Sequence, residues 1–312
     1  MAVEIVQTTA MLPAIQKVLD GGYTVHKLWE AADRDALLKQ VAPRVHGMVT
    51  AAAVGAKRDL IEALPNLKVI SSFGVGYDSI DINAAKDRGV IVTNTPDVLT
   101  ECVADTAMGL TLGMLRRLPQ ADAFVRQGRW TKDRFPLTDK LGGKLMGIVG
   151  AGRIGLAIAK RAEAFGMRIC YFGPRKKAEL SWPYYDNLAA MAKDADILMV
   201  SCPGGKETHR LINAEVIAAL GPDGYVVNIS RGSVIDEPAL VKALVDGKIA
   251  GAGLDVFEAE PTVPEALWKL DNVALAPHIG SATRQTRQAM GELMLENLAA
   301  YFAGKPVLSR VV

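Results

Sequence analysis

Short apolar runs alternate with stretches of helical periodicity along most of the chain, and this alternation predicts an α/β protein with parallel sheets. In the first hundred residues, the apolar runs expected to form strands are 4–7, 24–27, 47–50, 68–71 and 90–93. Helices are expected between them, for example at 11–20 and 33–42. This part of the chain therefore predicts a small doubly wound sheet of its own.

The tripeptide Asn94-Thr95-Pro96 interrupts this pattern, and a long helix is expected from 100 to 118, with Asp97 or Thr100 as its cap. Six later apolar runs are nearly continuous, as is typical of parallel strands that are buried on both faces. They are 145–149, 167–172, 197–201, 225–229, 252–256 and 273–276. A last helix, 281–302, is expected to pack on the first part of the chain.

A glycine-rich loop lies between the run 145–149 and the helical stretch 156–165, and Gly166 and a second strand follow. The spacing G-x-G-x-x-G lets the backbone approach a pyrophosphate at the N-terminus of a helix, so it predicts a dinucleotide site. An ordinary turn is the alternative. The loop residues assigned to the cofactor are Gly150, Gly152, Arg153, Ile154 and Gly155.

The end of the second strand indicates which dinucleotide binds. No acidic residue lies between Glu163 and Glu179, where a carboxylate would bind the ribose 2′-hydroxyl of NAD. Gly173 is instead followed by a basic cluster that includes Arg175 and Lys176, which would attract a 2′-phosphate. NADP(H) is therefore preferred and NAD(H) is a second possibility. The alternative for the cluster is a solvated basic turn.

Polar residues follow the last strands, and ligands of open parallel sheets bind beyond the carboxyl ends of the strands. Arg231 would hold and polarise a 2-oxo acid, protonated His278 would give a proton to the developing alkoxide, and Glu260 would orient the imidazole and stabilise its charge. A surface ion pair is the alternative for Arg231. Further residues at these strand ends are assigned to the cofactor: Cys202, Pro203, Thr208, Ile229, Ser230, Asp255 and Gly280.

Two of these assignments have named competitors. Glu258 is the alternative partner of the imidazole, and Glu260 is preferred because Pro261 fixes the backbone beside it. His278 has the alternative of an ordinary core histidine, and His209 is the competing general acid.

Composition sets the class of protein and its partners. The chain has 312 residues, of which 50% are hydrophobic and 22% charged, which is typical of a globular protein of two domains. A net charge of +2 is too small to indicate nucleic-acid binding. No apolar run is long enough to span a membrane. The three cysteines form no C-x-x-C pair, so we expect core thiols, no metal and a cytoplasmic location.

The ordered motifs of the whole chain resemble the D-isomer-specific 2-hydroxyacid dehydrogenases, and among them the hydroxypyruvate/glyoxylate and hydroxyphenylpyruvate reductases. The motifs are the dinucleotide loop and residues 71–78, 93–100, 228–232, 253–257 and 277–283. The resemblance implies a catalytic set of Arg231, Glu260 and His278. Because the last helix is expected to return to the first part of the chain, we expect a Rossmann dinucleotide domain, residues 98–284, inserted in a flavodoxin-like substrate domain made of residues 1–97 and 285–312.

The resemblance extends to substrate binding. It places the substrate carboxylate on the backbone N–H groups of Val75 and Gly76, where successive N–H groups in a glycine turn form an anion nest. A second substrate loop includes Ala53, where relatives often carry a polar residue, and Arg284 is a further substrate contact or a surface residue.

The expected function is NADPH-dependent reduction of a small 2-oxo acid, such as glyoxylate or hydroxypyruvate, to the D-2-hydroxy acid. The expected assembly is a homodimer formed through the helix 100–118 and its flanks. One alternative is the same chemistry on phenylpyruvate, phosphoglycerate or another 2-oxo acid. The other is a nicotinamide-sensing scaffold that binds partner proteins.

Overall fold

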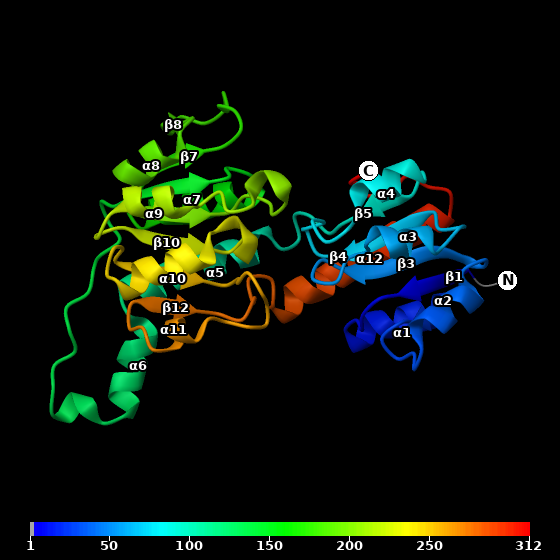
Figure 1. Cartoon of the computed structure of the whole chain (residues 1–312), viewed down its shortest axis with the longest axis horizontal. Coiled ribbons are helices and arrows are strands. Elements are labelled where there is room, and N and C mark those ends of the chain that lie inside the picture. The colour runs from blue at the N-terminus through cyan, green and yellow to red at the C-terminus, as the bar shows by residue number, and fades with distance from the viewer. Residues whose placement is uncertain (1–2) are drawn as a thin grey trace. The chain divides into compact units, whose positions relative to one another are not determined.

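The computed structural model describes residues 3–312, which form two compact units (Figure 1). The first unit contains the chain up to Leu99 together with Thr283–Val312, and the second contains Thr100–Ala282. The chain therefore leaves the first unit once and returns to it with its last helix.

The first unit is built on a five-stranded parallel sheet with the strand order β2-β1-β3-β4-β5. Its strands are β1 (Glu4–Gln7), β2 (Thr24–Lys27), β3 (Val45–Ala51), β4 (Val69–Phe73) and β5 (Ile91–Thr93). This is the flavodoxin-like order of a doubly wound sheet. The predicted sheet is confirmed, and its strands lie within two residues of the predicted bounds at each end.

Helices cover both faces of this sheet (Figure 1). They are α1 (Pro13–Gly22), α2 (Arg34–Val41), α3 (Arg58–Glu62), α4 (Ile82–Asp87) and α12 (Arg284–Phe302). Helix α12 packs against α1 and β4, and the hydroxyl of Ser71 on β4 donates to the carbonyl of Met294 at 2.8 Å. The last helix therefore completes the core of the first unit, and the expectation that it packs on the first part of the chain is confirmed.

The second unit is built on a seven-stranded parallel sheet with the order β12-β11-β10-β9-β6-β7-β8. Its strands are β6 (Leu145–Val149), β7 (Arg168–Phe172), β8 (Tyr184–Tyr185), β9 (Ile197–Val200), β10 (Tyr225–Asn228), β11 (Gly251–Leu254) and β12 (Val273–Leu275). Strand β6 is the first of the sheet and lies beside both β7 and β9. This is the Rossmann order with one added strand, and it confirms the predicted fold class.

Helices α5 and α7 pack together on one face of this sheet, and α8, α9 and α10 form a layer on the other (Figure 1). The helices of the unit are α5 (Thr100–Leu115), α6 (Leu118–Arg126), α7 (Arg153–Ala164), α8 (Leu188–Asp194), α9 (Ala214–Leu220), α10 (Glu237–Val245) and α11 (Glu265–Trp268). All residues of β9 and β10 are buried, because both faces of the sheet are covered. Cys170 and Cys202 are buried thiols outside disulfides, and burial raises their pKa values to about 12 and about 11.

Three helix bounds lie about three residues from the predicted ones. The helix expected at 100–118 ends at Leu115, and Arg117 takes a left-handed conformation with φ of 49° before α6 begins. Pro119 explains the break, because a proline is favourable in the first turn of a new helix and costly inside a longer one. Helix α7 begins at Arg153, within the glycine loop, and α12 begins at Arg284 after its cap Thr283.

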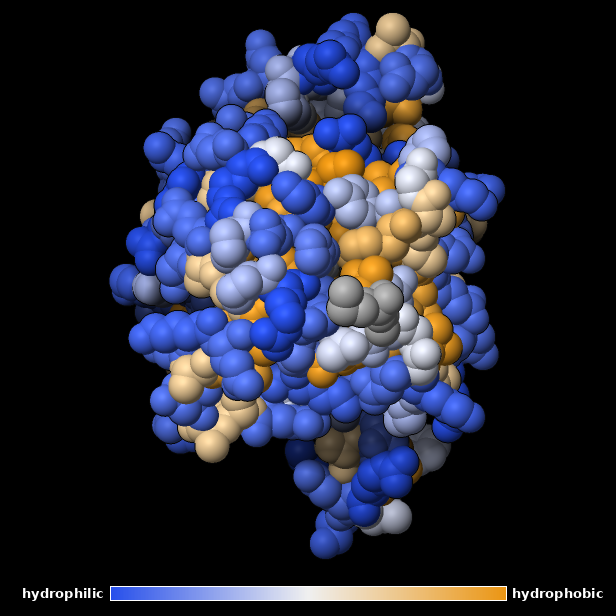
Figure 2. Space-filling view, turned by 90° about the vertical axis from the view of Figure 1, so that its right-hand side faces the viewer, coloured by the Kyte–Doolittle hydropathy of each residue, from blue (hydrophilic) through white to orange (hydrophobic). Residues whose placement is uncertain are grey.

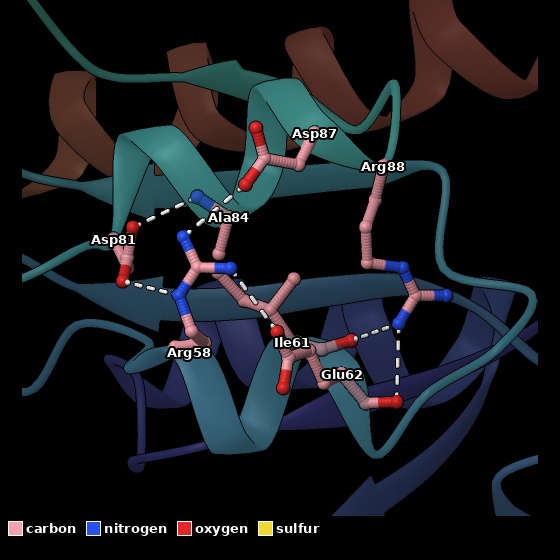
Figure 3. A network of polar contacts seen from close by, with 7 residues as sticks. All are labelled: Arg58, Ile61, Glu62, Asp81, Ala84, Asp87 and Arg88. Carbon is pink, nitrogen blue, oxygen red and sulfur yellow. Dashed lines mark hydrogen bonds and ion pairs between the residues drawn. The ribbon is translucent and has the colours of Figure 1, made fainter.

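A network of charged side chains joins α3 to α4 in the first unit (Figure 3). Arg58 forms ion pairs with Glu62 at 3.1 Å, with Asp87 at 3.2 Å and with Asp81, which is the N-cap of α4, at 3.4 Å. Arg88 donates to the backbone carbonyls of the last turn of α3 and of the residues after it. The loops that lead into the two helices are thereby held together, and these loops carry the predicted substrate contacts.

The face of the molecule in Figure 2 is mainly hydrophilic, with hydrophobic residues in a strip near its middle. Several large apolar side chains of the second unit are also exposed, on α6 and on the segment after it, and Trp130 is the largest of them. Between residues 3 and 312, no helix combines the length and the apolar character that crossing a bilayer requires.

Candidate active site

The candidate residues of the second unit follow the carboxyl ends of neighbouring parallel strands, at one edge of the sheet. The glycine loop follows β6, the basic turn follows β7, and Cys202 and Pro203 follow β9. Ile229, Ser230 and Arg231 follow β10, Asp255 follows β11, and His278 and Gly280 follow β12. Strand order reverses between β6 and β9, which is where a dinucleotide binds in such sheets.

Each of the three glycines of the loop is needed for a different structural reason. Gly150 has φ of 96°, and a Cβ on it would lie 2.6 Å from the Cα of Cys202 at the end of β9. A Cβ on Gly155 would collide with the carbonyl oxygen of Gly150. A Cβ on Gly152 would meet no atom within 4 Å, so this position is open to a ligand.

Gly152 is also the N-cap residue of α7, and no side chain caps the helix there. Arg153 and Ile154 form the first turn of this 12-residue helix. The first N–H groups of a helix lack partners within it, and a Cβ on Gly152 would meet no atom within 4 Å, so there is room for an anion at the start of α7. The loop therefore fits a pyrophosphate. The conformation of the loop also depends on Ser201, whose hydroxyl donates to the carbonyl of Gly150 at 2.9 Å. Ser201 was not predicted from the sequence.

Two tyrosine hydroxyls fix the basic turn after β7. Tyr184 donates to the carbonyl of Gly173 at 3.1 Å, and the N–H of Lys177 donates to the hydroxyl of Tyr171 at 2.8 Å. Arg175 and Lys176 are exposed, and neither forms an ion pair within residues 3–312. The turn thus presents unpaired cations on a fixed backbone, as a 2′-phosphate requires.

His278 and Glu260 form a direct pair. The Nδ1 atom of His278 lies 2.7 Å from Oε2 of Glu260, and Oε1 of Glu260 accepts from the N–H of Phe257 at 3.1 Å. A carboxylate only accepts hydrogen bonds, so Nδ1 carries the proton in this pair. Within the described residues, Nε2 of His278 has no hydrogen-bond partner, so it is open to a ligand.

Asp255 holds the backbone of the histidine. His278 has φ of 54°, an unusual conformation for a residue with a side chain, and its N–H donates to the Asp255 carbonyl at 2.8 Å. The carboxylate of Asp255 accepts from the N–H groups of Ile279 at 2.7 Å and Gly280 at 2.8 Å. Burial raises the pKa of Asp255, and these two N–H groups oppose that effect. Asp255 therefore positions the imidazole, and its carboxylate is already bonded to the loop.

The competing residues lie elsewhere. Glu258 forms an ion pair with Arg210 at 3.2 Å, and its N–H donates to Glu237. His209 is exposed at the end of a short 3-10 helix, Lys206–Thr208. Thr208, predicted to contact the cofactor, donates to the carbonyl of Pro203 at 2.7 Å and closes its own loop. Neither competitor is joined to the pair of His278 and Glu260.

The loop of Arg231 is fixed on both sides. Asn228 donates from Nδ2 to the carbonyl of Arg231 at 2.9 Å and accepts from the N–H of Ser230 at 3.0 Å. Gly232 packs so closely on the backbone of Phe257 that a Cβ would collide with it, which ties this loop to the one that carries Glu260. Asn228 lies within a motif that the sequence analysis singled out, although its supporting role was missed.

In the first unit, the turn after β4 leaves two successive N–H groups without partners. Gly74 is bonded twice, since its N–H donates to the Thr95 hydroxyl at 3.0 Å and its carbonyl accepts from the Thr95 N–H at 2.9 Å. The N–H groups of Val75 and Gly76 have no hydrogen-bond partner within residues 3–312. Ala53 is exposed on the neighbouring loop after β3, and Arg284 is exposed at the first position of α12. The turn has the free donors that an anion nest needs.

Comparison with known proteins identifies the family. The model of the D-isomer specific 2-hydroxyacid dehydrogenase, NAD binding domain, matches residues 108–280. The chain belongs to the D-isomer specific 2-hydroxyacid dehydrogenases. It is therefore an oxidoreductase with an NAD-binding domain, and the resemblance found in its sequence is confirmed.

The relatives are similar over their whole length. The chain is 48% identical over 312 residues to a hydroxyphenylpyruvate reductase of Plectranthus scutellarioides, covering 100% of this chain and 99% of the relative. It is 46% identical to glyoxylate/hydroxypyruvate reductase A of Arabidopsis thaliana, covering 96% and 95%. A crystal structure of an NADPH-dependent glyoxylate/hydroxypyruvate reductase from Sinorhizobium meliloti, in complex with NADP and malonate, superimposes with a TM-score of 0.95 at 44% identity, covering 100% and 97%.

The open position at Gly152 gives a test of the cofactor site. We expect Gly152→Ala to keep the thermal stability of the protein, since its Cβ meets no protein atom, and to weaken NADPH binding at least about tenfold by filling the pyrophosphate space. Binding is measured by the fluorescence of NADPH. Gly109→Ala is the matched control, because its Cβ also meets nothing and it lies in α5. Unchanged NADPH affinity in Gly152→Ala would contradict the assignment.

Proposed function

We propose that this protein uses NADPH to reduce a small 2-oxo acid, glyoxylate or hydroxypyruvate, to the D-2-hydroxy acid. The observation that carries the proposal is the pair of His278 and Glu260, with Nδ1 bonded at 2.7 Å and Nε2 open. A proton donor backed by a carboxylate is what reduction of a carbonyl requires, because the oxygen gains negative charge as the hydride arrives. A bound reduced nicotinamide supplies that hydride.

The chain's own residues then have separate roles. His278 donates a proton from Nε2 to the substrate oxygen, and Glu260 stabilises the imidazolium and keeps the ring oriented. The guanidinium of Arg231 binds the substrate and polarises its carbonyl. The N–H groups of Val75 and Gly76 bind the carboxylate, and Ala53 and Arg284 are further substrate contacts. In this division the first unit binds the substrate carboxylate, and the second unit binds the dinucleotide and supplies Arg231 and His278 to the substrate carbonyl.

The substrate is the part of the proposal that needs an assay. Steady-state oxidation of NADPH is measured with glyoxylate, hydroxypyruvate, phenylpyruvate and hydroxyphenylpyruvate. We expect the highest kcat/KM with one of the two small acids. A second candidate is an aromatic 2-oxo acid. It is favoured because a relative at 48% identity is a hydroxyphenylpyruvate reductase, and because the loop of Ala53 and exposed Val54 is apolar. No oxidation with any 2-oxo acid would contradict both.

The histidine assignment has a direct test. His278→Asn removes the acid at Nε2 and should lower kcat by roughly 10²–10⁴-fold, with much less change in the Kd for NADPH. Glu260→Gln should lower kcat as well, because a neutral amide does not stabilise an imidazolium. His209→Ala is the matched control and should keep kcat, since His209 is exposed and lies outside the pair. If His209→Ala lost activity and His278→Asn kept it, the two roles would be exchanged.

The preference for NADP(H) is proposed from the basic turn, and a relative crystallised with NADP has a similar fold. Arg175→Ser should raise KM for NADPH about tenfold, because a charge-assisted hydrogen bond to the 2′-phosphate is lost, and should leave KM for NADH unchanged. Both constants come from initial rates at saturating 2-oxo acid. Lys193→Ala, an exposed lysine on α8, is the control. An equal rise in KM for NADPH and for NADH would show that Arg175 does not bind the 2′-phosphate.

We also propose that the protein is a cytoplasmic homodimer. The surface that supports this lies on α6 and the segment after it, where Leu118 and Val125 are each more than half exposed, Trp130 is 70% exposed and Leu137 is fully exposed. Apolar side chains of this size are typical of a subunit interface. Sedimentation should give twice the chain mass, and Trp130→Glu with Leu137→Glu should give monomers. A monomeric wild-type protein would contradict the proposal.

A further inference from the structure

Asn94 lies directly after β5 and is 9% exposed. Its side-chain Nδ2 donates to the carbonyl oxygen of Val75 at 2.8 Å. The bond joins two segments that are 19 residues apart in the chain, and it ends on the turn proposed to bind the substrate carboxylate. The mechanism above gives Asn94 no role.

The geometry of a peptide bond extends the effect of this contact. The carbonyl of Val75 and the N–H of Gly76 belong to one planar trans peptide unit, so they point in opposite directions. Fixing the carbonyl therefore fixes the direction of the N–H. The two bonds between Gly74 and Thr95 fix the preceding residue. The segment Asn94-Thr95 thus determines the orientation of a turn whose unpaired groups are the donors of the nest.

Further hydrogen bonds from the C-terminal part of the chain fix the backbone of Asn94. The hydroxyl of Ser309, in the C-terminal segment, donates to the Asn94 carbonyl at 2.6 Å, and the N–H of Asn94 donates to the Ser309 carbonyl at 3.3 Å. Asn297 on α12 is fully buried, donates to Ser309 Oγ at 2.8 Å, and accepts from the N–H groups of Leu308 and Ser309. The bonds form a continuous chain from α12 through the C-terminal segment to the turn.

We infer that Asn94 is a positioning residue for substrate binding, and that Ser309 and Asn297 on the C-terminal part of the chain hold it in place. The inference rests on the proposed function, because it assumes that the Val75–Gly76 turn binds the carboxylate of a 2-oxo acid. Asn94 acts through the peptide of the turn and does not touch the substrate. Its loss therefore weakens carboxylate binding and leaves the dinucleotide site of the other unit intact.

The first experiment compares Asn94→Ala with the wild-type protein. KM for glyoxylate should rise about tenfold with kcat within about twofold, because the carboxylate is bound in both the ground state and the transition state. The Kd for NADPH should stay within about twofold, which a general loss of folding would not allow. Asn66→Ala is the matched control, since Asn66 also donates from its amide to a backbone carbonyl, that of Pro43 at 2.8 Å, in the same unit. KM in Asn66→Ala should equal the wild-type value.

A second pair of variants keeps the inference testable if Asn94→Ala does not fold. Ser309→Ala removes the hydroxyl that donates to Asn94 and should raise KM for glyoxylate about threefold, whereas Ser309→Thr keeps a hydroxyl and should restore the wild-type KM. An unchanged KM in both Asn94→Ala and Ser309→Ala would overturn the inference. So would a lower kcat with unchanged KM. A wild-type protein that does not oxidise NADPH with any 2-oxo acid would instead overturn the proposed function.

Discussion

The buried carboxylate of Asp255 is the interaction on which the reacting end of the second unit depends. Asp255 joins the ends of β11 and β12: its backbone carbonyl accepts from the N–H of His278, and its carboxylate accepts from the N–H groups of Ile279 and Gly280. Burying a carboxylate is unfavourable, and a charge of this kind is tolerated where hydrogen bonds surround it. Those bonds hold His278 in a left-handed conformation with φ of 54°. The buried carboxylate thereby fixes the position of the imidazole.

In the dinucleotide loop, the conformation is constrained by the close packing of backbone atoms and not by a buried charge. Two of its glycines are required by the protein itself, because a side chain at Gly150 or Gly155 would displace neighbouring backbone. Only Gly152 leaves room that the protein does not use. A structure can thus separate glycines that serve folding from a glycine that serves a ligand, although the sequence motif presents all three alike.

Much of the fold could be predicted from the sequence, because strands buried on both faces are apolar throughout and helices between them show their period. The pair of Glu260 and His278 follows from motifs at strand ends. What could not be predicted depends on distant partners. Ser201 and Asn94 act through hydrogen bonds to backbone carbonyls, which any residue supplies, so no pattern marks them. The helix break at Arg117 was missed because the apolar period continues through it, and Pro119 was the available signal.

The return of the chain to the first unit has a consequence for how the protein is made. Met290, Met294 and Leu298 of α12 are buried in the core of the first unit, which is otherwise built from residues before Leu99. A ribosome therefore completes the whole second unit before it releases the helix that the first unit lacks. Until α12 emerges, the apolar surface that it covers on β4 and α1 stays exposed. The first unit therefore cannot complete its core until the second unit has been synthesised.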